Sequence, residues 1–137
     1  MIVADTNLVA YLFINGRYST LAERVFAKDP RWAAPLLWRS EFRSVLLKCV
    51  REGRFGTNDA MQIADAAEIL LAGSEYAMGV SDPEVLRIAV EAPGCSAYDA
   101  EFVALARELG LPLVTADERL LKAFPGTAIR LELFATT

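Results

Sequence analysis

Short apolar runs alternate along the chain with longer segments in which apolar residues recur every three or four positions. The short runs are typical of strands, and we expect strands at residues 2–5, 31–35, 74–80, 111–115 and 128–133. The longer segments have the period of amphipathic helices. These expected helices span residues 7–14, 19–28, 37–52, 57–73, 81–92, 96–110 and 116–124.

The alternation of strands and helices predicts an α/β protein. Parallel strands joined by helices need right-handed crossovers, which place helices on both faces of a sheet. We therefore expect a three-layer α/β/α fold with a mostly parallel central sheet, in one domain over residues 1–137. Such sheets bind ligands beyond the carboxyl ends of their strands, so polar residues at those ends are candidate site residues.

The sequence contains no histidine, and this excludes several kinds of catalytic site. Ser-His-Asp and Cys-His catalysis, histidine-based RNA cleavage and the HExxH zinc site all require that side chain. The two cysteines, Cys49 and Cys95, are too few for a structural zinc site and indicate buried thiols in a reducing compartment. An enzyme with this composition must therefore rely on carboxylates or metal ions.

Apolar residues make up 54% of the chain, and its mean hydropathy is +0.29. This value is high for a small domain and suggests that a partner, such as a second copy of the chain, covers apolar surface. No apolar run is long enough to span a bilayer, and the N-terminus lacks the basic flank of a signal peptide. We therefore expect a cytoplasmic protein without membrane attachment.

Two aspartates follow predicted strands. Asp5 ends the first strand, and Asp117 follows the strand at residues 111–115. If both strands are parallel, both carboxylates lie at the same edge of the sheet. The alternative interpretation is that each aspartate caps the helix after it, because aspartate is a preferred N-cap residue.

Two further acids lie on predicted helices. Asp99 follows Ser96 at the spacing of a capping box, but it also shares a helix face with Phe102. Glu41 lies within the apolar stripe of the helix at residues 37–52, in its middle, where a glutamate cannot cap the helix. A buried carboxylate is costly unless it is paired or binds a metal. Glu41 therefore indicates either an ion pair with an arginine or a metal site.

Four carboxylates held close together repel one another, and divalent cations relieve this repulsion. Ligand sets made only of oxygen favour Mg²⁺ or Mn²⁺ over zinc. The formal net charge of −4 equals the charge of these four acids, so two bound divalent ions would offset it. The acidic total therefore does not exclude a substrate that carries phosphate.

Four segments together resemble a known family. They are D-T-N after the first strand, the inward glutamate near residue 40, S-A-Y-D-A-E-F-V-A-L-A near residue 100, and V-T-A-D near residue 117. Their order and spacing along the whole chain resemble those of PIN-domain ribonucleases, and more narrowly of the VapC toxins of type II (VapBC) toxin–antitoxin systems. The resemblance implies metal-binding, catalytic roles for Asp5, Glu41, Asp99 and Asp117.

The resemblance also implies an activity and supporting residues. The expected reaction is endonucleolytic hydrolysis of tRNA, rRNA or mRNA with Mg²⁺ or Mn²⁺ as the cofactor. Small polar residues of the motifs would orient the carboxylates, and these are Thr6, Asn7 and Thr115. The basic residues expected to contact the RNA phosphates are Arg17, Arg39 and Arg43.

The partner implied by the resemblance is a VapB-like antitoxin that inhibits the enzyme. We expect a toxin homodimer, and a heterotetramer or a larger assembly with the antitoxin. The candidate groove for the antitoxin lies among the helices at residues 7–14, 19–28 and 37–52. Its candidate lining residues, for each of which core packing is the alternative, are Phe13, Leu21, Val25 and Leu46.

Two other functions stay open at this point. The first is a PIN fold without catalysis that binds RNA or protein. The second is a receiver-like signalling domain, which also gathers acids and Mg²⁺ at the ends of parallel strands. Receiver-like domains normally have adjacent acids early in the chain and a lysine beside the site late in the chain. Here Asp5 precedes a threonine and an asparagine, and no lysine follows the strand at residues 111–115 at the expected place.

Overall fold

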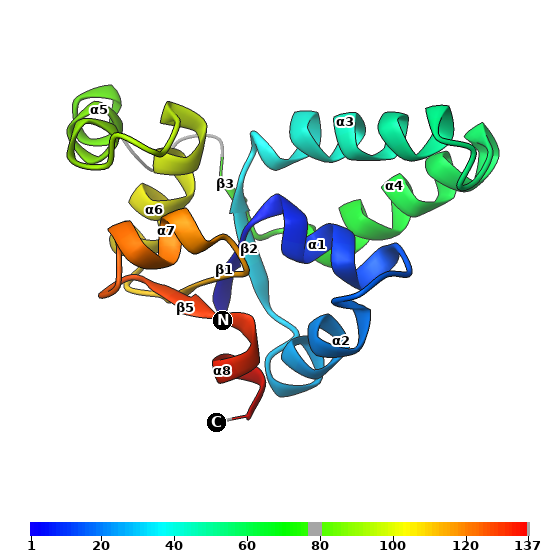
Figure 1. The fold of residues 1–137 in the computed structure, drawn as a ribbon, viewed down its shortest axis with the longest axis horizontal. Coiled ribbons are helices and arrows are strands. Elements are labelled where there is room, and N and C mark those ends of the chain that lie inside the picture. Colours follow the sequence, from blue (N-terminus) through cyan, green and yellow to red (C-terminus); the bar gives the residue numbers. More distant parts are fainter. Residues whose placement is uncertain (77–80, 137) are drawn as a thin grey trace.

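The computed structural model describes residues 1–76 and 81–136, and in these residues a five-stranded parallel sheet is flanked by eight helices (Figure 1). The strands are β1 (Ile2–Ala4), β2 (Trp32–Pro35), β3 (Glu75–Tyr76), β4 (Leu113–Thr115) and β5 (Ala128–Arg130). The helices are α1 (Thr6–Phe13), α2 (Ser19–Lys28), α3 (Trp38–Arg51), α4 (Thr57–Leu71), α5 (Asp82–Glu91), α6 (Ala97–Leu109), α7 (Glu118–Ala123) and α8 (Leu131–Thr136). The expected three-layer α/β/α fold is confirmed.

The strand order of the sheet is β3-β2-β1-β4-β5. The chain runs outward from β1 to β2 and β3, and then crosses to β4 and β5 on the other side of β1. This reversal places the carboxyl ends of β1 and β4 side by side at a topological switch point, where open α/β sheets bind ligands. The order also differs from the 2-1-3-4-5 order of receiver-like sheets, so the receiver-like alternative does not fit the fold.

Helices cover both faces of the sheet. Helix α6 packs across β1, β2 and β4 on one face, and α1 and α4 cover the other face (Figure 1). All residues of these three strands are buried, and so are the consecutive α6 residues Phe102–Ala106. Strands covered on both sides need apolar residues at every position, which explains the short continuous apolar runs. No helix among the described residues is long and apolar enough to cross a membrane.

The C-terminal end differs from the expectation of a strand at residues 128–133. Strand β5 ends at Arg130, and Leu131–Thr136 forms the helix α8. The partner strand β4 offers only three residues for pairing, with Thr115 opposite Arg130, so a longer strand would have no neighbour. Leu131 is fully buried, and α8 packs against α2. The alternating pattern was therefore produced by a short strand followed by a short helix.

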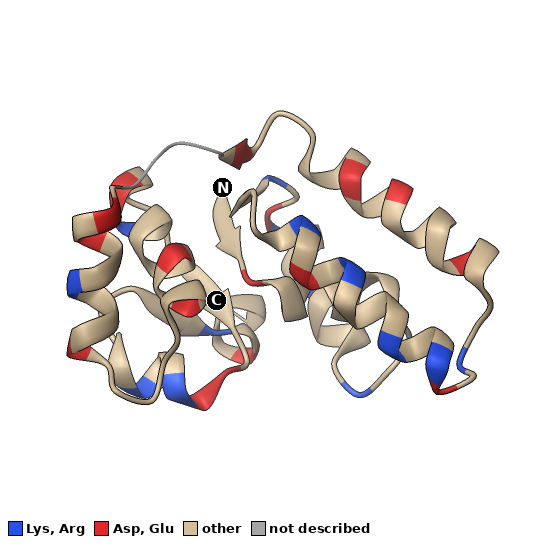
Figure 2. Ribbon diagram, turned by 90° about the horizontal axis from the view of Figure 1, so that it is seen from above, with Lys and Arg blue, Asp and Glu red and all other residues tan. Residues whose placement is uncertain are grey.

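Two other boundaries also differ from the expectations. The strand expected at residues 74–80 is present at Glu75–Tyr76, and residues 77–80 of that expectation lie outside the described part of the chain. Helix α3 begins at Trp38, so Glu41 lies in its first turn and not in its middle. Figure 2 shows that α3 carries both acidic and basic positions along its length.

An ion pair attaches the edge strand β3 to the helices beside it. The Arg39 guanidinium of α3 donates to both carboxylate oxygens of Glu75, at 2.6 and 2.8 Å, and to Glu68 of α4 at 3.1 Å. The Glu75 side chain is 12% exposed, and the hydrogen bonds from Arg39 hold its pKa below the ordinary value. A two-pronged arginine–carboxylate contact of this kind is geometrically specific as well as strong.

Replacement of this arginine should loosen the edge of the sheet. We expect Arg39→Ala to lower the urea midpoint of unfolding, because the largely covered Glu75 carboxylate loses its partner. The matched control on the same helix is Lys48→Ala, which removes the exposed 4.0 Å pair between Lys48 and Glu52 and should leave the midpoint unchanged. Equal midpoints for the two variants would show that the Arg39 contact does not stabilise the fold.

Candidate metal centre

The four acids singled out in the sequence line one hollow of about 310 Å³ at the carboxyl ends of β1 and β4. Asp5 directly follows β1, and Asp117 lies two residues after β4. Glu41 comes from α3, and Asp99 comes from α6. The other residues that line this acid hollow are Thr6, Asn7, Ser44, Val45, Phe102 and Leu120. Residues that are far apart in the sequence thus share one small cavity.

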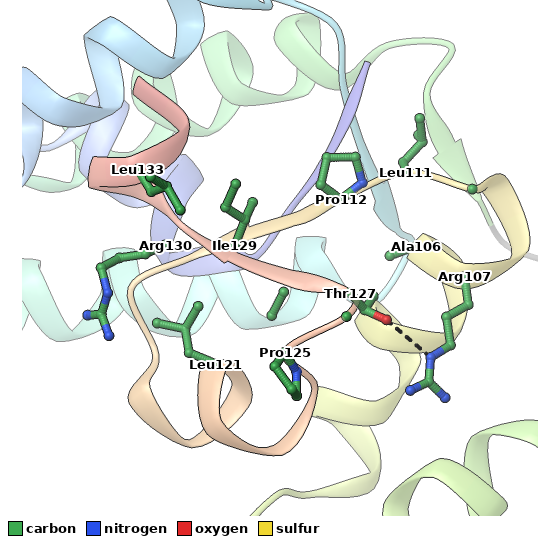
Figure 3. A pocket seen from close by; sticks show the side chains of 13 residues that line it. Ala106, Arg107, Leu111, Pro112, Leu121, Pro125, Thr127, Ile129, Arg130 and Leu133 are labelled. Atoms are coloured by element: carbon green, nitrogen blue, oxygen red, sulfur yellow. Dashed lines mark hydrogen bonds between the residues drawn. The ribbon is translucent and has the colours of Figure 1, made fainter. Parts of the chain in front are cut away.

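A larger hollow of about 740 Å³ lies elsewhere on the molecule (Figure 3). It is formed by the end of α6 and by the segments around β4 and β5, and it contains none of the four acids. Arg107 on its rim donates to the Thr127 hydroxyl at 3.2 Å. Size therefore does not identify the candidate site, whereas the grouping of titratable side chains does.

Asp5 is buried, with 8% of its surface exposed. Its Oδ1 accepts a hydrogen bond from the backbone N–H of Leu8 at 2.8 Å, which makes Asp5 the N-cap of α1. Its Oδ2 accepts from the Thr115 hydroxyl. Burial raises the pKa of Asp5 to about 6, and the nearby carboxylates of Asp117 and Glu41 add to this rise. The two hydrogen bonds act in the opposite direction.

Thr115 connects the two acids at the strand ends. It is fully buried, and its hydroxyl donates to Asp5 while it accepts from the backbone N–H of Asp117 at 3.0 Å. One side chain at the end of β4 therefore fixes the Asp5 carboxylate and the turn that carries Asp117. This position suits the orienting role that we expected for Thr115.

Asp117 and Asp99 both take part in capping interactions. Asp117 is the N-cap of α7, and its Oδ1 accepts from the backbone N–H of Arg119 at 2.9 Å. Asp99 forms the expected capping box with Ser96, with both hydrogen bonds at 3.0 Å. The capping interpretation thus holds for these residues and for Asp5, and it does not exclude a site role, because all three side chains also line the acid hollow.

Glu41 is half-buried in the first turn of α3, and its Oε1 accepts from the Thr6 hydroxyl at 2.7 Å. Burial raises the pKa of Glu41, and the charges of Asp99 and Glu101 raise it further. Glu101 therefore lies within electrostatic reach of the site. Among the described residues no lysine or arginine pairs with Glu41, so the ion-pair interpretation finds no partner there.

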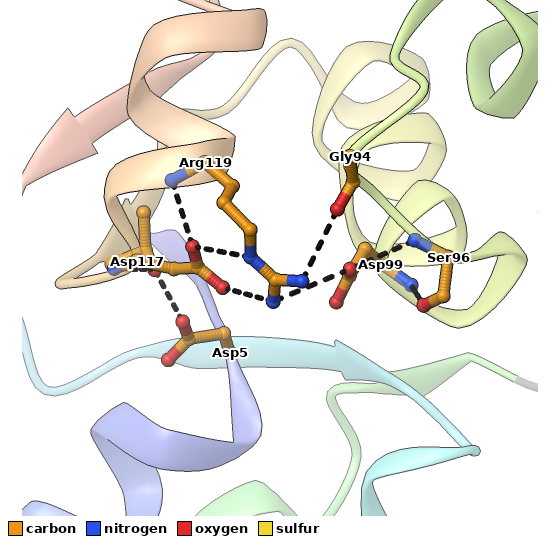
Figure 4. A network of polar contacts seen from close by, with 7 residues as sticks. Asp5, Gly94, Ser96, Asp99, Asp117 and Arg119 are labelled. Carbon is orange, nitrogen blue, oxygen red and sulfur yellow. Dashed lines mark hydrogen bonds and ion pairs between the residues drawn. The ribbon is translucent and has the colours of Figure 1, made fainter.

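A guanidinium stands between two of the acids (Figure 4). Arg119 contacts Asp117 through Nε and Nη2, at 3.3 and 2.9 Å, and its Nη2 lies 3.9 Å from Oδ2 of Asp99. Its Nη1 donates to the carbonyl oxygen of Gly94 at 3.1 Å. Hydrogen bonds from Arg119 hold the pKa of Asp117 below its ordinary value. Arg119 was not among the predicted site residues, and its position two residues after the candidate cap Asp117 is the one sign of it in the sequence.

The side chains that line the acid hollow have the ligand atoms that a divalent cation prefers. Four carboxylates line the hollow together with the hydroxyls of Thr6 and Ser44, and oxygen ligands of these kinds are those that Mg²⁺ and Mn²⁺ favour. The space between Asp99 and Asp117 already accepts a positive charge. As the side chains stand, no three acidic or thiol groups in the described chain are close enough to hold an ion. Cation binding therefore requires the carboxylates to move closer together.

The other expected site residues lie in different surroundings. Asn7 is exposed at the rim of the acid hollow. Arg17 is exposed, and its guanidinium carbon lies 5.3 Å from the centre of the Tyr18 ring. Arg39 is engaged by Glu75, and Arg43 is exposed on α3. Of the three arginines proposed for RNA contact, Arg17 and Arg43 are thus the two exposed ones.

Residues 2–125 match the family model described as PIN domain, and the chain therefore belongs to the PIN-domain family. PIN domains are generally nucleases, which are hydrolases. This match confirms the resemblance that the four motifs indicated, and it is consistent with a VapC-like PIN protein.

Two solved structures are similar to the chain over nearly its whole length. The structure of PAE2754 from Pyrobaculum aerophilum has a TM-score of 0.73 and 27% sequence identity, with 98% of this chain and 93% of that chain covered. The structure of FitAcB from Neisseria gonorrhoeae has a TM-score of 0.73 and 14% identity, with 96% and 99% covered, and this likeness supports the fold alone. A search of curated proteins found no match.

The burial of Asp5 should make the stability of the metal-free protein depend on pH. Its folded-state pKa of about 6 lies above the ordinary value of 3.8, so the protonated carboxyl stabilises the fold fully below pH 3.8 and this contribution is lost as the pH rises through 6. Relative to Asp5→Asn, the wild-type protein should lose about 1.4 kcal/mol of unfolding free energy between pH 5 and pH 8. Urea unfolding in EDTA at both pH values measures this difference.

The control for this experiment is Asp65→Asn, which changes an exposed aspartate on α4. Its unfolding free energy should follow that of the wild-type protein at both pH values. If the Asp5→Asn variant also keeps a constant offset from the wild-type protein, the buried Asp5 carboxyl does not titrate near pH 6.

Proposed function

We propose that this protein is the toxin of a VapBC-type toxin–antitoxin system and that it hydrolyses RNA with Mg²⁺ or Mn²⁺. In this proposal residues 1–137 form one catalytic domain. The observation that carries the proposal is the grouping of four acids in one cavity at the switch point of a PIN-domain sheet. PIN domains are generally nucleases, and the absence of histidine leaves carboxylates as the catalytic side chains.

Each side chain of the hollow has a role in the proposed reaction. Bound Mg²⁺ or Mn²⁺ supplies Lewis acidity and lowers the pKa of water. Asp5 and Asp99 would be the principal ligands of the ion. Glu41 would bind it directly or through a water, and Asp117 would act in its outer shell or at a second site. The hydroxyls of Thr6 and Thr115 keep the Glu41 and Asp5 carboxylates in fixed orientations.

The chemistry of the side chains also predicts the products. The chain has no histidine that could deprotonate the ribose 2′-hydroxyl, so we propose that water attacks the phosphorus atom. The bond between phosphorus and the 3′ oxygen breaks as the bond to the water oxygen forms, and one proton of the water ends on the departing 3′ oxygen. The phosphate stays on the 5′ end of the downstream fragment. A cyclic 2′,3′-phosphate product would contradict this proposal.

The RNA strand is proposed to extend from the acid hollow into a neighbouring cavity of about 280 Å³, which shares Asn7 and Val45 with it. The rings of Tyr11 and Tyr18 lie there with their centres 4.8 Å apart, and the exposed Arg17 lies over Tyr18. Aromatic rings and arginines are the groups on which unpaired bases stack. This arrangement supports a single-stranded substrate, which Arg17 would contact.

A VapB-like antitoxin is the proposed inhibitor. A further cavity of about 460 Å³ lies between α1 and α4, and not among the three helices expected to form the groove. Its lining combines apolar side chains such as Phe13, Phe55 and Ile63 with polar ones such as Arg54 and Asp59, and this mixture suits an amphipathic segment of a partner. Val25 and Leu46 are buried in the core, so core packing explains these two of the four candidate lining residues. Because the acids already accept Arg119, an arginine of the antitoxin is chemically suited to block them.

Removal of a carboxylate should abolish cleavage. We expect Asp5→Asn and Asp99→Asn to lower the rate of Mg²⁺-dependent RNA cleavage by about 100-fold or more, since each removes a charged ligand. The rates are measured on purified tRNA and rRNA, with EDTA as the metal-free control and Asp65→Asn as the control for loss of an exposed acid. Wild-type rates in both site variants would rule out the assignment of these acids.

The same variants separate a toxin from a silent binding module. Expression of the wild-type chain in a bacterial host should arrest growth, whereas Asp99→Asn, expressed at the same level, should not. Viable-cell counts after induction measure the effect, and Asp65→Asn should arrest growth like the wild-type chain. Growth arrest by Asp99→Asn, together with RNA binding but no cleavage by the wild-type protein, would support the non-catalytic alternative.

A further inference from the structure

We propose that Arg119 is an internal counter-ion of the candidate metal centre, and that a divalent cation must displace it from Asp99 and Asp117 in order to bind. The inference rests on the metal-dependent function proposed above. It concerns how the centre is loaded, and it assigns a role to a side chain outside the four acids.

The contacts of Arg119 indicate that it competes with the metal ion for the carboxylates of Asp99 and Asp117. Its Nε and Nη2 engage both oxygens of Asp117, and Nη2 also faces Oδ2 of Asp99 (Figure 4). A cation bound by Asp117 and Asp99 would use the same lone pairs. The guanidinium and the ion would also repel each other at this distance. Both cannot occupy the space between the two aspartates at the same time.

The other contacts of Arg119 allow its side chain to leave the two aspartates, because its 3.1 Å hydrogen bond to the carbonyl oxygen of Gly94 is exposed and water can replace it. Its side chain is 61% exposed, and exposed ion pairs contribute little to stability. The hydrogen bond from the backbone N–H of Arg119 to Asp117 Oδ1 does not depend on the position of the guanidinium. The side chain can therefore turn toward solvent while α7 and its N-cap stay in place.

Electrostatic attraction favours the contact between the Arg119 guanidinium and the acids when the metal is absent. Ionisation of one acid makes ionisation of its neighbours less favourable, since the charges of Asp117 and Glu41 raise the pKa of Asp5. Arg119 offsets the charge of Asp117 and lowers its pKa. The positive charge of Arg119 thus reduces the repulsion between the ionised acids when no metal is bound. The same charge lowers the affinity of the hollow for Mg²⁺ or Mn²⁺.

The test is a titration of the full-length protein with Mn²⁺ alone, in which electron paramagnetic resonance measures the free ion. We expect Arg119→Gln to bind Mn²⁺ about fivefold more tightly than the wild-type protein, the size of effect that an exposed ion pair allows. Arg119→Lys should lie between the two, because lysine keeps the charge but loses the planar fork. Circular dichroism verifies that each variant is folded.

The matched control is Arg130→Gln, which removes the same charge from an arginine that pairs with Glu118 of α7. It should change the Mn²⁺ affinity less than twofold. Equal affinity in Arg119→Gln and the wild-type protein, or weaker binding in the variant, would overturn the counter-ion role and leave the proposed metal centre intact. Absence of Mn²⁺ binding in every protein, the wild type included, would overturn the metal centre and this inference with it.

Discussion

The mutual repulsion of four carboxylates in one small hollow is the constraint on which the arrangement of this molecule depends. Backbone N–H groups at the helix beginnings offset part of this repulsion, because they donate to the N-caps Asp5 and Asp117 and to Asp99 in its capping box with Ser96. The hydroxyls of two threonines and the guanidinium of Arg119 offset more. Glu41 lies in a first helical turn, where the helix dipole also favours negative charge. Each acid is thus held by a group that stabilises its ionised form.

The fold brings these stabilising groups to one place. The switch between β1 and β4 sets two strand ends side by side, and Thr115 joins them through its contacts with Asp5 and the Asp117 backbone. The helices α3 and α6 then begin on either side of this edge and supply the remaining acids. Capping and a site role are therefore compatible for the aspartates: the interaction that begins each helix also sets the carboxylate in the hollow.

The sequence was sufficient for the parts of the fold that depend on local pattern. Continuous apolar runs identified the buried strands, and acids that follow strands or interrupt an apolar stripe identified the residues that line the hollow. The helix at Leu131–Thr136 was mistaken for a strand, because alternation over six residues does not reveal how long the partner strand is. Arg119 was missed because an exposed arginine reveals its partners only when Asp99 and Asp117 are brought together.

Burial of Asp5 links the charge of the hollow to its chemistry. A carboxyl with a pKa of about 6 is ionised at neutral pH but carries a proton below that value, so cation binding in acid must be accompanied by proton release. The hydrogen bonds that Leu8 and Thr115 donate favour the ionised form and lower this pKa. The hollow is lined by carboxylates and hydroxyls with no imidazole or thiolate, and such a lining favours Mg²⁺ and Mn²⁺ over zinc. The buried carboxyl that costs stability without a cation is therefore also one of the oxygen ligands of the proposed metal centre.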